Sequence, residues 1–216
     1  MQISTPDNNS RSFEYRRSWL DFRKRKVEVG VDGITIDTGL PFLKKEKYLS
    51  KDKIEGFRYG IHGVRGIYFY VALDFKFYFL LKDQSVVSLT YRSYYGHAKE
   101  QHHELFSQVL DTIWNLIFVQ RMKEILQALN EGKEVIVSKV KLSEKGVTIR
   151  RGGIIVDEEN FIPWQEVATA DYASYFVIYS TKDKTHINCS YRYLDDWNTA
   201  LLNGVIRTIL EHVKLK

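Results

Sequence analysis

The stretch GITI at residues 33–36 returns almost unchanged as GVTI at residues 146–149, which lie 113 positions further along the chain. The same offset pairs Ile54 with Val167, one apolar residue with another. In a chain of 216 residues, this repetition predicts a tandem duplication of one small domain. Two units of roughly 90–100 residues fall within the usual size range of domains, so each can form its own core.

Composition limits the classes of protein to which the chain can belong. Apolar residues make up 44% of the sequence, which is ordinary for a globular protein. The net charge of +5 fits a solvated surface as well as it fits an anionic partner. The single cysteine, Cys189, excludes an internal disulfide and a multi-cysteine zinc site. The polar N-terminus and the lack of a run of about 18–20 apolar residues predict a soluble, cytoplasmic protein.

Residues 1–22 are expected to precede the first repeated unit. Residues 1–11 are mostly polar and predict a flexible tail. In residues 13–22, Tyr15, Trp19 and Leu20 have helical spacing, which predicts a short helix.

The first unit begins with a predicted hairpin. Val27, Val29 and Val31 alternate with other residues, which is typical of a strand, and Asp32-Gly33 forms a turn into the next strand. The segments expected after this hairpin are residues 48–59, a long turn with three glycines at residues 60–66, and strands at residues 67–81, broken near Asp74, and at residues 86–91.

A long helix is predicted at residues 101–129. Apolar residues recur there with helical periodicity, and Asn130-Glu131-Gly132 ends the pattern. About 28 residues at ~1.5 Å each give a helix about 42 Å long. We expect its first half to cover the first sheet and its second half to contact the second unit, so that the helix couples the two units rigidly.

The second unit repeats the plan in shorter form. Its predicted strands lie at residues 135–142, 147–149, 161–172, 175–180 and 186–191, and its predicted helix lies at residues 197–213. Thr90-Tyr91-Arg92 returns as Ser190-Tyr191-Arg192 with an offset of 100, not 113. The first unit therefore holds thirteen extra residues between Tyr59 and Tyr91, which a longer hairpin would absorb.

Each unit is thus predicted to be α+β, with several antiparallel strands followed by one C-terminal helix. This order resembles the pleckstrin-homology-like (PH-like) fold, and more narrowly the bacterial PH-like domains of unknown function. The resemblance lies in the turn-Gly-apolar-Thr-apolar hairpin of both units, in FIPWQEV at residues 161–167, and in a helix with a tryptophan, Trp114 or Trp197, at the end of each unit.

The resemblance covers residues 23–213 and implies two tandem PH-like domains, at residues 23–130 and 131–216. Each would be a bent sheet or partly open barrel capped by its helix, with the first helix long and bridging. The first unit departs from the pattern, because residues 48–54 contain neither proline nor tryptophan.

PH domains that bind phosphoinositides use clustered Lys and Arg around their first hairpin, where basic side chains and turn N–H groups meet phosphates. The resemblance therefore makes the basic hairpin of the second unit the candidate anion-binding site, with Lys139, Lys141, Lys145, Arg150 and Arg151. The first unit has acidic Asp32 and Asp37 near its turn. Neither unit has the spaced Lys…Arg-x-Arg pattern of the lipid binders, so a solvated surface remains the alternative.

Two other clusters have structural explanations. Residues 23–26, Arg-Lys-Arg-Lys, lie near aromatic residues and suggest nucleic acid, but a charged edge strand explains them more simply. His97, His102 and His103 precede the long helix, and adjacent His102 and His103 would point to different sides of it, so we expect no metal site. The repeated Tyr-Arg pair at residues 91–92 and 191–192 is interpreted as a structural contact.

No enzyme signature, such as a Gly-x-Ser-x-Gly elbow or His-Glu-x-x-His, is present in the sequence. Cys189 is expected to be a packed side chain in a strand and not a nucleophile. We therefore predict a non-enzymatic binding or scaffolding module without cofactors, whose partner is a protein or peptide. The alternative is peripheral binding to an anionic membrane through the basic hairpin of the second unit. A nucleic-acid partner is not expected, and the oligomeric state is not predicted.

Overall fold

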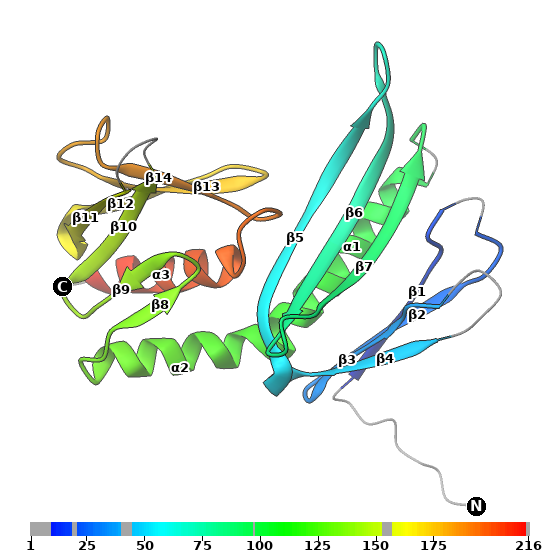
Figure 1. The fold of residues 1–216 in the computed structure, drawn as a ribbon, viewed down its shortest axis with the longest axis horizontal. Coiled ribbons are helices and arrows are strands. Elements are labelled where there is room, and N and C mark those ends of the chain that lie inside the picture. Colours follow the sequence, from blue (N-terminus) through cyan, green and yellow to red (C-terminus); the bar gives the residue numbers. More distant parts are fainter. Residues whose placement is uncertain (1–9, 19–20, 40–44, 97, 153–156, 215–216) are drawn as a thin grey trace, which may run out of the picture. The chain divides into compact units, whose positions relative to one another are not determined.

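The computed structural model describes residues 10–18, 21–39, 45–96, 98–152 and 157–214, and it describes only the backbone of residues 151, 152, 157, 213 and 214. The chain divides into two compact units, Met1–Val119 and Gln120–Lys216. Both combine antiparallel sheets with helices, so the predicted α+β class is confirmed (Figure 1). Among the described residues, no sheet closes into a barrel, and no helix is long and apolar enough to cross a membrane.

The first unit contains two antiparallel sheets. Its strands are β1 (Ser10–Tyr15), β2 (Arg25–Gly30), β3 (Gly33–Asp37), β4 (Glu46–Ser50), β5 (Ile54–Arg65), β6 (Tyr70–Leu81) and β7 (Val86–Tyr94). The strands pair in the order β1-β2-β3-β4 in one sheet and β5-β6-β7 in the other. A 3-10 turn, η1 (Lys51–Lys53), connects the two sheets.

A helix without a break follows β7, as predicted. It consists of α1 (Lys99–Ile113), a π-helical turn η2 (Trp114–Phe118) and α2 (Val119–Asn130). The division between the two units falls inside this helix. The rigid coupling of the units through the helix stays a prediction.

The core of the first unit lies between α1 and the β5–β7 sheet. Successive inward positions of β6 carry phenylalanine, and Phe75, Phe77 and Phe79 are completely buried. The ring of Phe77 lies 4.7 Å from that of Phe106 in α1. Full burial of a side chain of this size contributes about 1.5–3 kcal/mol, so this aromatic layer holds the helix on the sheet.

The second unit repeats the first with shorter elements. Its strands are β8 (Val135–Val137), β9 (Val140–Leu142), β10 (Gly146–Gly152), β11 (Asp157–Pro163), β12 (Val167–Asp171), β13 (Tyr175–Ser180) and β14 (Asn188–Arg192). The sheet orders are β11-β10-β9-β8 and β12-β13-β14, with the 3-10 turn η3 (Trp164–Glu166) between them and the helix α3 (Thr199–Lys214) at the end.

Backbone contacts explain why glycine recurs at residues 33 and 146. A Cβ atom at Gly33 would collide with the backbone carbonyl oxygen of Leu49, and one at Gly146 would collide with that of Ile162. These two strand residues are themselves separated by the repeat offset of 113. Glycine is required at both positions because the neighbouring strand passes too close for any side chain.

The turns that follow these hairpins also share their hydrogen bonds. The N–H of Lys51 donates to the carbonyl oxygen of Asp32 at 2.9 Å, and the N–H of Trp164 donates to that of Lys145 at 3.3 Å. Both donors and both acceptors are 113 residues apart. The duplication predicted from the short sequence repeats therefore also holds for the backbone hydrogen bonds of the turns that follow them.

The thirteen extra residues of the first unit lengthen one hairpin, as predicted. β5 and β6 have 12 residues each, whereas β12 and β13 have 5 and 6. The predicted long turn at residues 60–66 is wrong, because β5 continues to Arg65. Gly63 lies within the strand, where its missing side chain leaves room for the ring of Tyr70.

The predicted break near Asp74 is also wrong. Asp74 lies inside β6 directly opposite Arg92 of β7, and the two side chains form an ion pair. Its charge is therefore neutralised inside a regular strand, and the strand does not need to end there.

Three further element predictions are corrected by the structure. The predicted helix at residues 13–22 is wrong for its described part, because β1 pairs with β2 and ends at buried Tyr15. Residues 19–20 of that helix and residues 1–9 of the predicted tail lie outside the described residues. Residues 135–142 form two strands, since Ser138 has a left-handed backbone (φ 58°) that makes a turn. Residues 161–172 are not one strand, because Pro163 ends β11 and buried Trp164 begins η3.

Candidate functional site

The basic residues predicted to form an anion site are spread along the hairpins of the second unit. Lys139 lies in the β8–β9 turn, Lys141 in β9, Lys145 in the β9–β10 turn and Arg150 in β10. The side chain of Arg151 lies outside the described residues. Lys139 and Lys145 are at opposite ends of β9, so the structure does not bring all the predicted residues to one point.

Most of these charges are already neutralised by carboxylates. Lys139 pairs with Asp196 at 3.0 Å, Lys141 with Glu134 at 2.7 Å, and Arg150 with Glu159 at 2.5 Å. The hydrogen bond from Arg150, followed by the charges of Arg150 and Lys141, lowers the pKa of Glu159 below its ordinary value. The hairpin is therefore a surface of mixed charge, not a free cationic patch.

A row of exposed residues crosses the same sheet and was missed from the sequence. Ile136, Lys141, Thr148 and Phe161 lie opposite one another on β8, β9, β10 and β11. Ile136 is 73% exposed and Phe161 is 52% exposed. The residue pairing that creates this row depends on the turn at Ser138, which was not predicted from the sequence.

The corresponding row of the first unit has different chemistry. It consists of Ser12, Glu28, Thr35 and Tyr48, paired across β1, β2, β3 and β4. Serine replaces isoleucine at one end, and glutamate replaces lysine in the second position. Only the second unit therefore presents an apolar side chain at both ends of the row.

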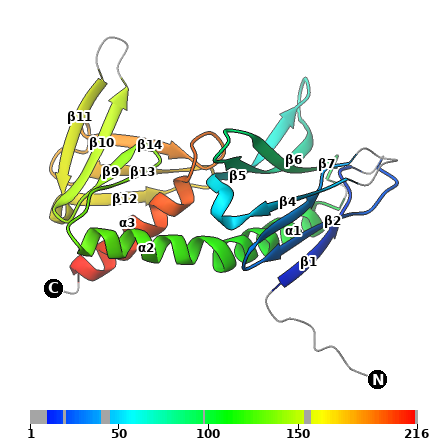
Figure 2. The same cartoon turned by 60° about the horizontal axis from the view of Figure 1, so that its bottom comes forward.

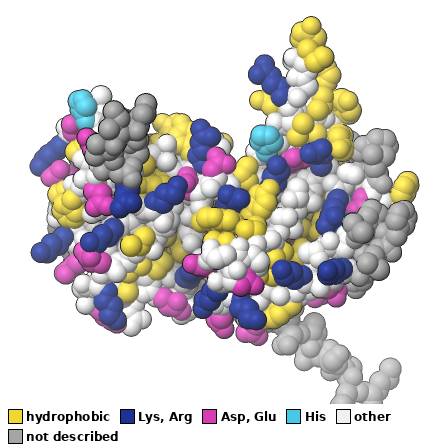
Figure 3. Space-filling view, in the orientation of Figure 1, with side chains coloured by type: hydrophobic (Ala, Val, Ile, Leu, Met, Phe, Trp, Pro, Cys, Tyr) yellow, Lys and Arg dark blue, Asp and Glu magenta, His cyan; other side chains and the backbone are white. Residues whose placement is uncertain are grey.

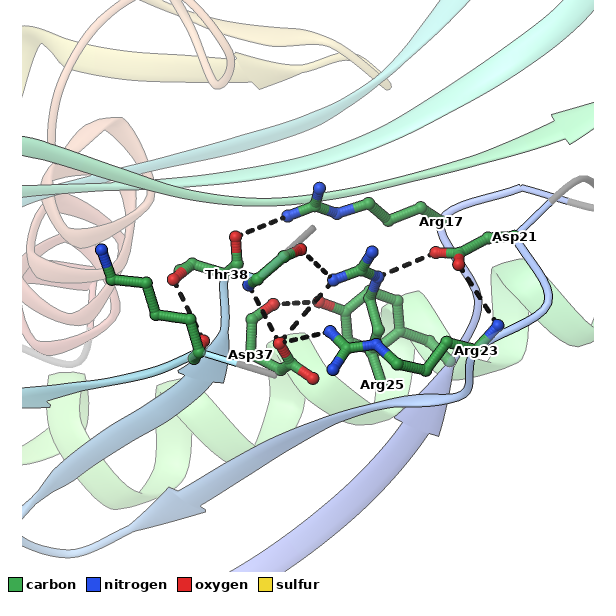
Figure 4. A network of polar contacts seen from close by, with 9 residues as sticks. Arg17, Asp21, Arg23, Arg25, Asp37 and Thr38 are labelled. Carbon is green, nitrogen blue, oxygen red and sulfur yellow. Dashed lines mark hydrogen bonds and ion pairs between the residues drawn. The ribbon is translucent and has the colours of Figure 1, made fainter. Parts of the chain in front are cut away.

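The basic run at residues 23–26 forms part of a buried polar network in the first unit (Figure 4). The side chain of Arg25 is completely buried; its Nε donates to Asp21 at 2.8 Å and its Nη1 to the carbonyl oxygen of Gly39 at 2.5 Å. Arg23 donates to Asp37 at 2.8 Å. Lys24 and Lys26 pair with Glu14 and Glu28.

The interpretation of this run as a charged edge strand is wrong. β2 lies between β1 and β3, so β1 and β4 are the edges of the sheet. The four basic residues have carboxylate partners, and none is a free phosphate ligand in this arrangement. The function of Arg25 is to hold together the loops that follow β1 and β3.

The carboxylates of this network have lowered pKa values. Burial alone would raise the pKa of Asp21 and Asp37, but hydrogen bonds outweigh it and lower both values. Arg25 supplies the largest such contribution at Asp21, and the N–H of Gly39 supplies it at Asp37. Both carboxylates therefore stay ionised and act as structural anchors.

A cavity of about 520 Å³ opens near this network, between the end of β1, the end of β7 and the beginning of α1. Tyr15, Lys24, Arg92 and His102 contribute to its wall. Arg92 is committed to Asp74 through two hydrogen bonds, one of them 2.9 Å long. Burial would raise the pKa of Asp74, but the bonds from Arg92 lower it, so Arg92 is held in place as part of the wall.

The histidines at the beginning of α1 pack on the core. Both His102 and His103 contact the ring of Phe75, with ring centres 5.8 Å and 5.0 Å apart, and Nδ1 of His102 lies 2.7 Å from the carbonyl oxygen of Ala98. His97 lies outside the described residues. Among the residues that the structure describes, no group of three or more His, Cys, Asp or Glu could hold a metal ion.

In the repeated Tyr-Arg pair, the tyrosines make a repeated structural contact, as interpreted. The arginines do not, because Arg92 pairs with Asp74 and Arg192 pairs with Asp195. Tyr91 pairs with Phe75 across the sheet at a ring distance of 5.1 Å, and Tyr191 pairs with Phe176 in the same way at 5.5 Å. The hydroxyl of Tyr91 also donates to the carbonyl oxygen of His102 at 3.3 Å. Burial raises the pKa of both tyrosines, which keeps them neutral.

The apex of the β5–β6 hairpin is the largest cluster of exposed apolar side chains in the described chain (Figure 3). It consists of Ile67, Tyr68, Phe69 and Tyr70, with Tyr95 beside it. Ile67 and Tyr68 are 87% and 90% exposed. These residues were predicted to lie in a strand at residues 67–81, because aromatic residues are common in strands.

A comparison with protein-family models finds no match for this chain, and a comparison with curated proteins finds none either.

Proposed function

We propose that the chain is a non-enzymatic binding and scaffolding module of two tandem PH-like units, and that its partner is a protein or peptide. The repeated order supports the PH-like assignment: four strands, a 3-10 turn, three strands and a helix occur in both units. The paired state of the buried Asp21, Asp37 and Asp74 supports a structural role for these carboxylates and not a catalytic one.

The observation that carries the proposal is the exposed row on the second unit. Ile136 and Phe161 stand on regular strands, so little conformational entropy is lost when a partner covers them. The ion pairs Lys141–Glu134 and Arg150–Glu159 lie on the same sheet. Apolar side chains surrounded by polar groups are typical of protein interfaces.

The first unit is a weaker candidate for the same role. Its row has Tyr48 at one end but Ser12 at the other, with Glu28 between them. A partner that covers two apolar side chains on the second unit would meet only one on the first. We therefore assign protein docking to the sheet of the second unit.

The alternative, anionic-membrane binding through the basic hairpin, receives less support. Because Lys139, Lys141 and Arg150 have carboxylate partners, a phosphate would have to compete with each of them. Attraction of a cationic surface to anionic lipid depends on uncompensated charge.

Photo-crosslinking in the cells that express the protein tests the proposal. A benzophenone amino acid at position 161 is expected to form discrete adducts with a protein, and Ile136→Ser is expected to remove them. The same probe at position 48 is the matched control in the first unit. Absence of protein adducts at position 161, or identical adducts at both positions, would contradict the proposal.

A further inference from the structure

The β5–β6 hairpin continues beyond the third strand of its sheet. The last residue pair between β6 and β7 joins Ala72 to Tyr94, and the hairpin extends past it to a turn at residues 66–69. Figure 1 and Figure 2 show this hairpin projecting from the β5–β7 sheet. Beyond this pair β5 adds one residue, Arg65, and β6 adds two, Val71 and Tyr70, so at ~3.3 Å each the strands extend by about 3–7 Å before the turn.

The apex has a defined conformation. The N–H of Gly66 donates to the carbonyl oxygen of Phe69 at 2.7 Å and closes the turn. The ring of Phe69 contacts that of Tyr95 at 6.5 Å, and the ring of Tyr70 lies against Gly63. The exposed aromatic rings are therefore presented on a supported two-stranded ribbon.

Apolar side chains lie at the tip of this ribbon and on one of its faces. Ile67 and Tyr68 occupy the turn itself. A bulge between the pairs Val64–Ala72 and Arg65–Tyr70 places Tyr70 on the face of Phe75, where its ring lies against Gly63. A projecting tip of this kind can enter the interfacial layer of a membrane end-on, and that layer takes up exposed apolar side chains.

The charge near the apex is positive. Residues 60–73 contain no aspartate or glutamate, and Arg65, their one arginine or lysine, is exposed. The next carboxylate, Asp74, is buried and paired with Arg92. This distribution is complementary to anionic lipid headgroups.

We propose that the apex of the β5–β6 hairpin inserts into the interfacial layer of an anionic membrane. Ile67 and Phe69 enter the boundary between headgroups and acyl chains, while the hydroxyls of Tyr68 and Tyr70 stay at headgroup level, where tyrosine is favoured. Arg65 contacts lipid phosphate. The extension of the hairpin is comparable with the ~5–10 Å depth to which interfacial segments are buried.

The second unit supplies a matched sequence for the test. Its β12–β13 turn is closed by the N–H of Tyr172 donating to the carbonyl oxygen of Tyr175 at 2.9 Å, and its apex is Ala173-Ser174. The double variant Ile67→Ala, Tyr68→Ser therefore gives the first unit the apex of the second. Phe22→Ser is the control, because Phe22 (90% exposed) matches Tyr68 (90% exposed) in exposure but lies outside the apex.

Flotation of the full chain with vesicles measures insertion. We expect binding to phosphatidylcholine vesicles that contain about 30% phosphatidylglycerol and weaker binding to phosphatidylcholine alone. The apex double variant should lose roughly tenfold in partition coefficient, and Arg65→Glu should lose roughly fivefold on the anionic vesicles. Phe22→Ser should bind as the native chain does.

Three results would overturn the proposal. The native chain fails to float with anionic vesicles; the apex double variant floats as well as the native chain; or sedimentation equilibrium without lipid shows that the apex mediates self-association. Protein docking is assigned to the second unit and membrane insertion to the first. Missing crosslinks at position 161 would therefore contradict only the proposed function, and missing flotation would contradict only the membrane proposal.

Discussion

The β5–β6 hairpin of the first unit and the β12–β13 hairpin of the second occupy the same place in the repeated order of elements, yet they present different surfaces. One has strands of 12 residues and the apex Ile67-Tyr68, and the other has strands of 5 and 6 residues and the apex Ala173-Ser174. The duplicated backbone is retained where strands touch, as at Gly33 and Gly146. The two units differ instead in the length of this hairpin and in the residues at its apex.

The units also differ in where they place charge. In the first unit, Arg25, Asp21 and Asp37 are buried together. In the second unit, the ion pair Arg150–Glu159 is on the surface. A similar order of elements is therefore stabilised by different electrostatic arrangements, and the two units should respond differently to mutation and to acid.

The largest effect is expected from Arg25→Ala. It leaves Asp21 and part of Asp37 buried without their partner, which should lower the free energy of unfolding of the first unit by about 3–5 kcal/mol. The control, Arg150→Ala, breaks an exposed pair and should cost at most about 1 kcal/mol. Urea titration monitored by the indole N–H signals of Trp114 and Trp164 reports the two units separately. Equal effects of the two variants would contradict the proposed difference.

Gly33→Ala and Gly146→Ala should each destabilise their own unit by about 1–3 kcal/mol, because the new Cβ displaces a neighbouring strand. The same urea titration measures both. Similar costs would strengthen the structural equivalence of the two glycines. If alanine were tolerated at one position only, the close approach of strands would not be a shared requirement.

Acid should unfold the first unit before the second. The pKa values of Asp21, Asp37 and Asp74 in the folded chain lie below the ordinary value of 3.8. Their stabilising contribution is therefore complete above about pH 3.8 and is lost as the pH falls through the lowered values. In the second unit, carboxyls with lowered pKa such as Glu159 and Asp183 are on the surface and contribute less.

Thermal unfolding between pH 6 and pH 2, followed at Trp114 and Trp164, measures this order. Asp74→Asn should make the first unit less sensitive to acid, although less stable at neutral pH. Simultaneous loss of both indole signals at every pH would contradict the prediction.

The smallest effect on stability is expected from the apex double variant Ile67→Ala, Tyr68→Ser. Both side chains are almost fully exposed, so the free energy of unfolding should change by no more than about 0.5 kcal/mol. Differential scanning calorimetry checks this. A large destabilisation would show that the apex supports the fold, and its exposed aromatics would then need no external partner.

Much of the repeated framework could be predicted from the sequence, because short-range patterns determine it. The repeats GITI and GVTI predicted both hairpins, and helical periodicity predicted α1 and α3. Predictions failed where a residue distant in the sequence neutralises a charge or accepts a hydrogen bond. Asp74 stays in a strand because Arg92 neutralises it, and Arg25 is buried because Asp21 and Gly39 receive its donors.

The candidate sites were harder to predict for the same reason. Lys139, Lys141 and Arg150 form a basic cluster in the sequence, but folding brings Asp196, Glu134 and Glu159 to them. The exposed apex could not be predicted, because its aromatic residues are equally typical of a buried strand. Only the point at which β7 stops pairing, at Tyr94, separates the buried part of that segment from the exposed part.

The most direct test compares the two apices in one assay. Cysteine is introduced at Tyr68 or at Ala173 in a Cys189→Ser background, labelled with an environment-sensitive dye, and mixed with anionic vesicles. The account predicts a blue shift of emission for the label at position 68 and none at position 173. Equal shifts at both positions, or an unshifted label at position 68 on vesicle-bound protein, would contradict it.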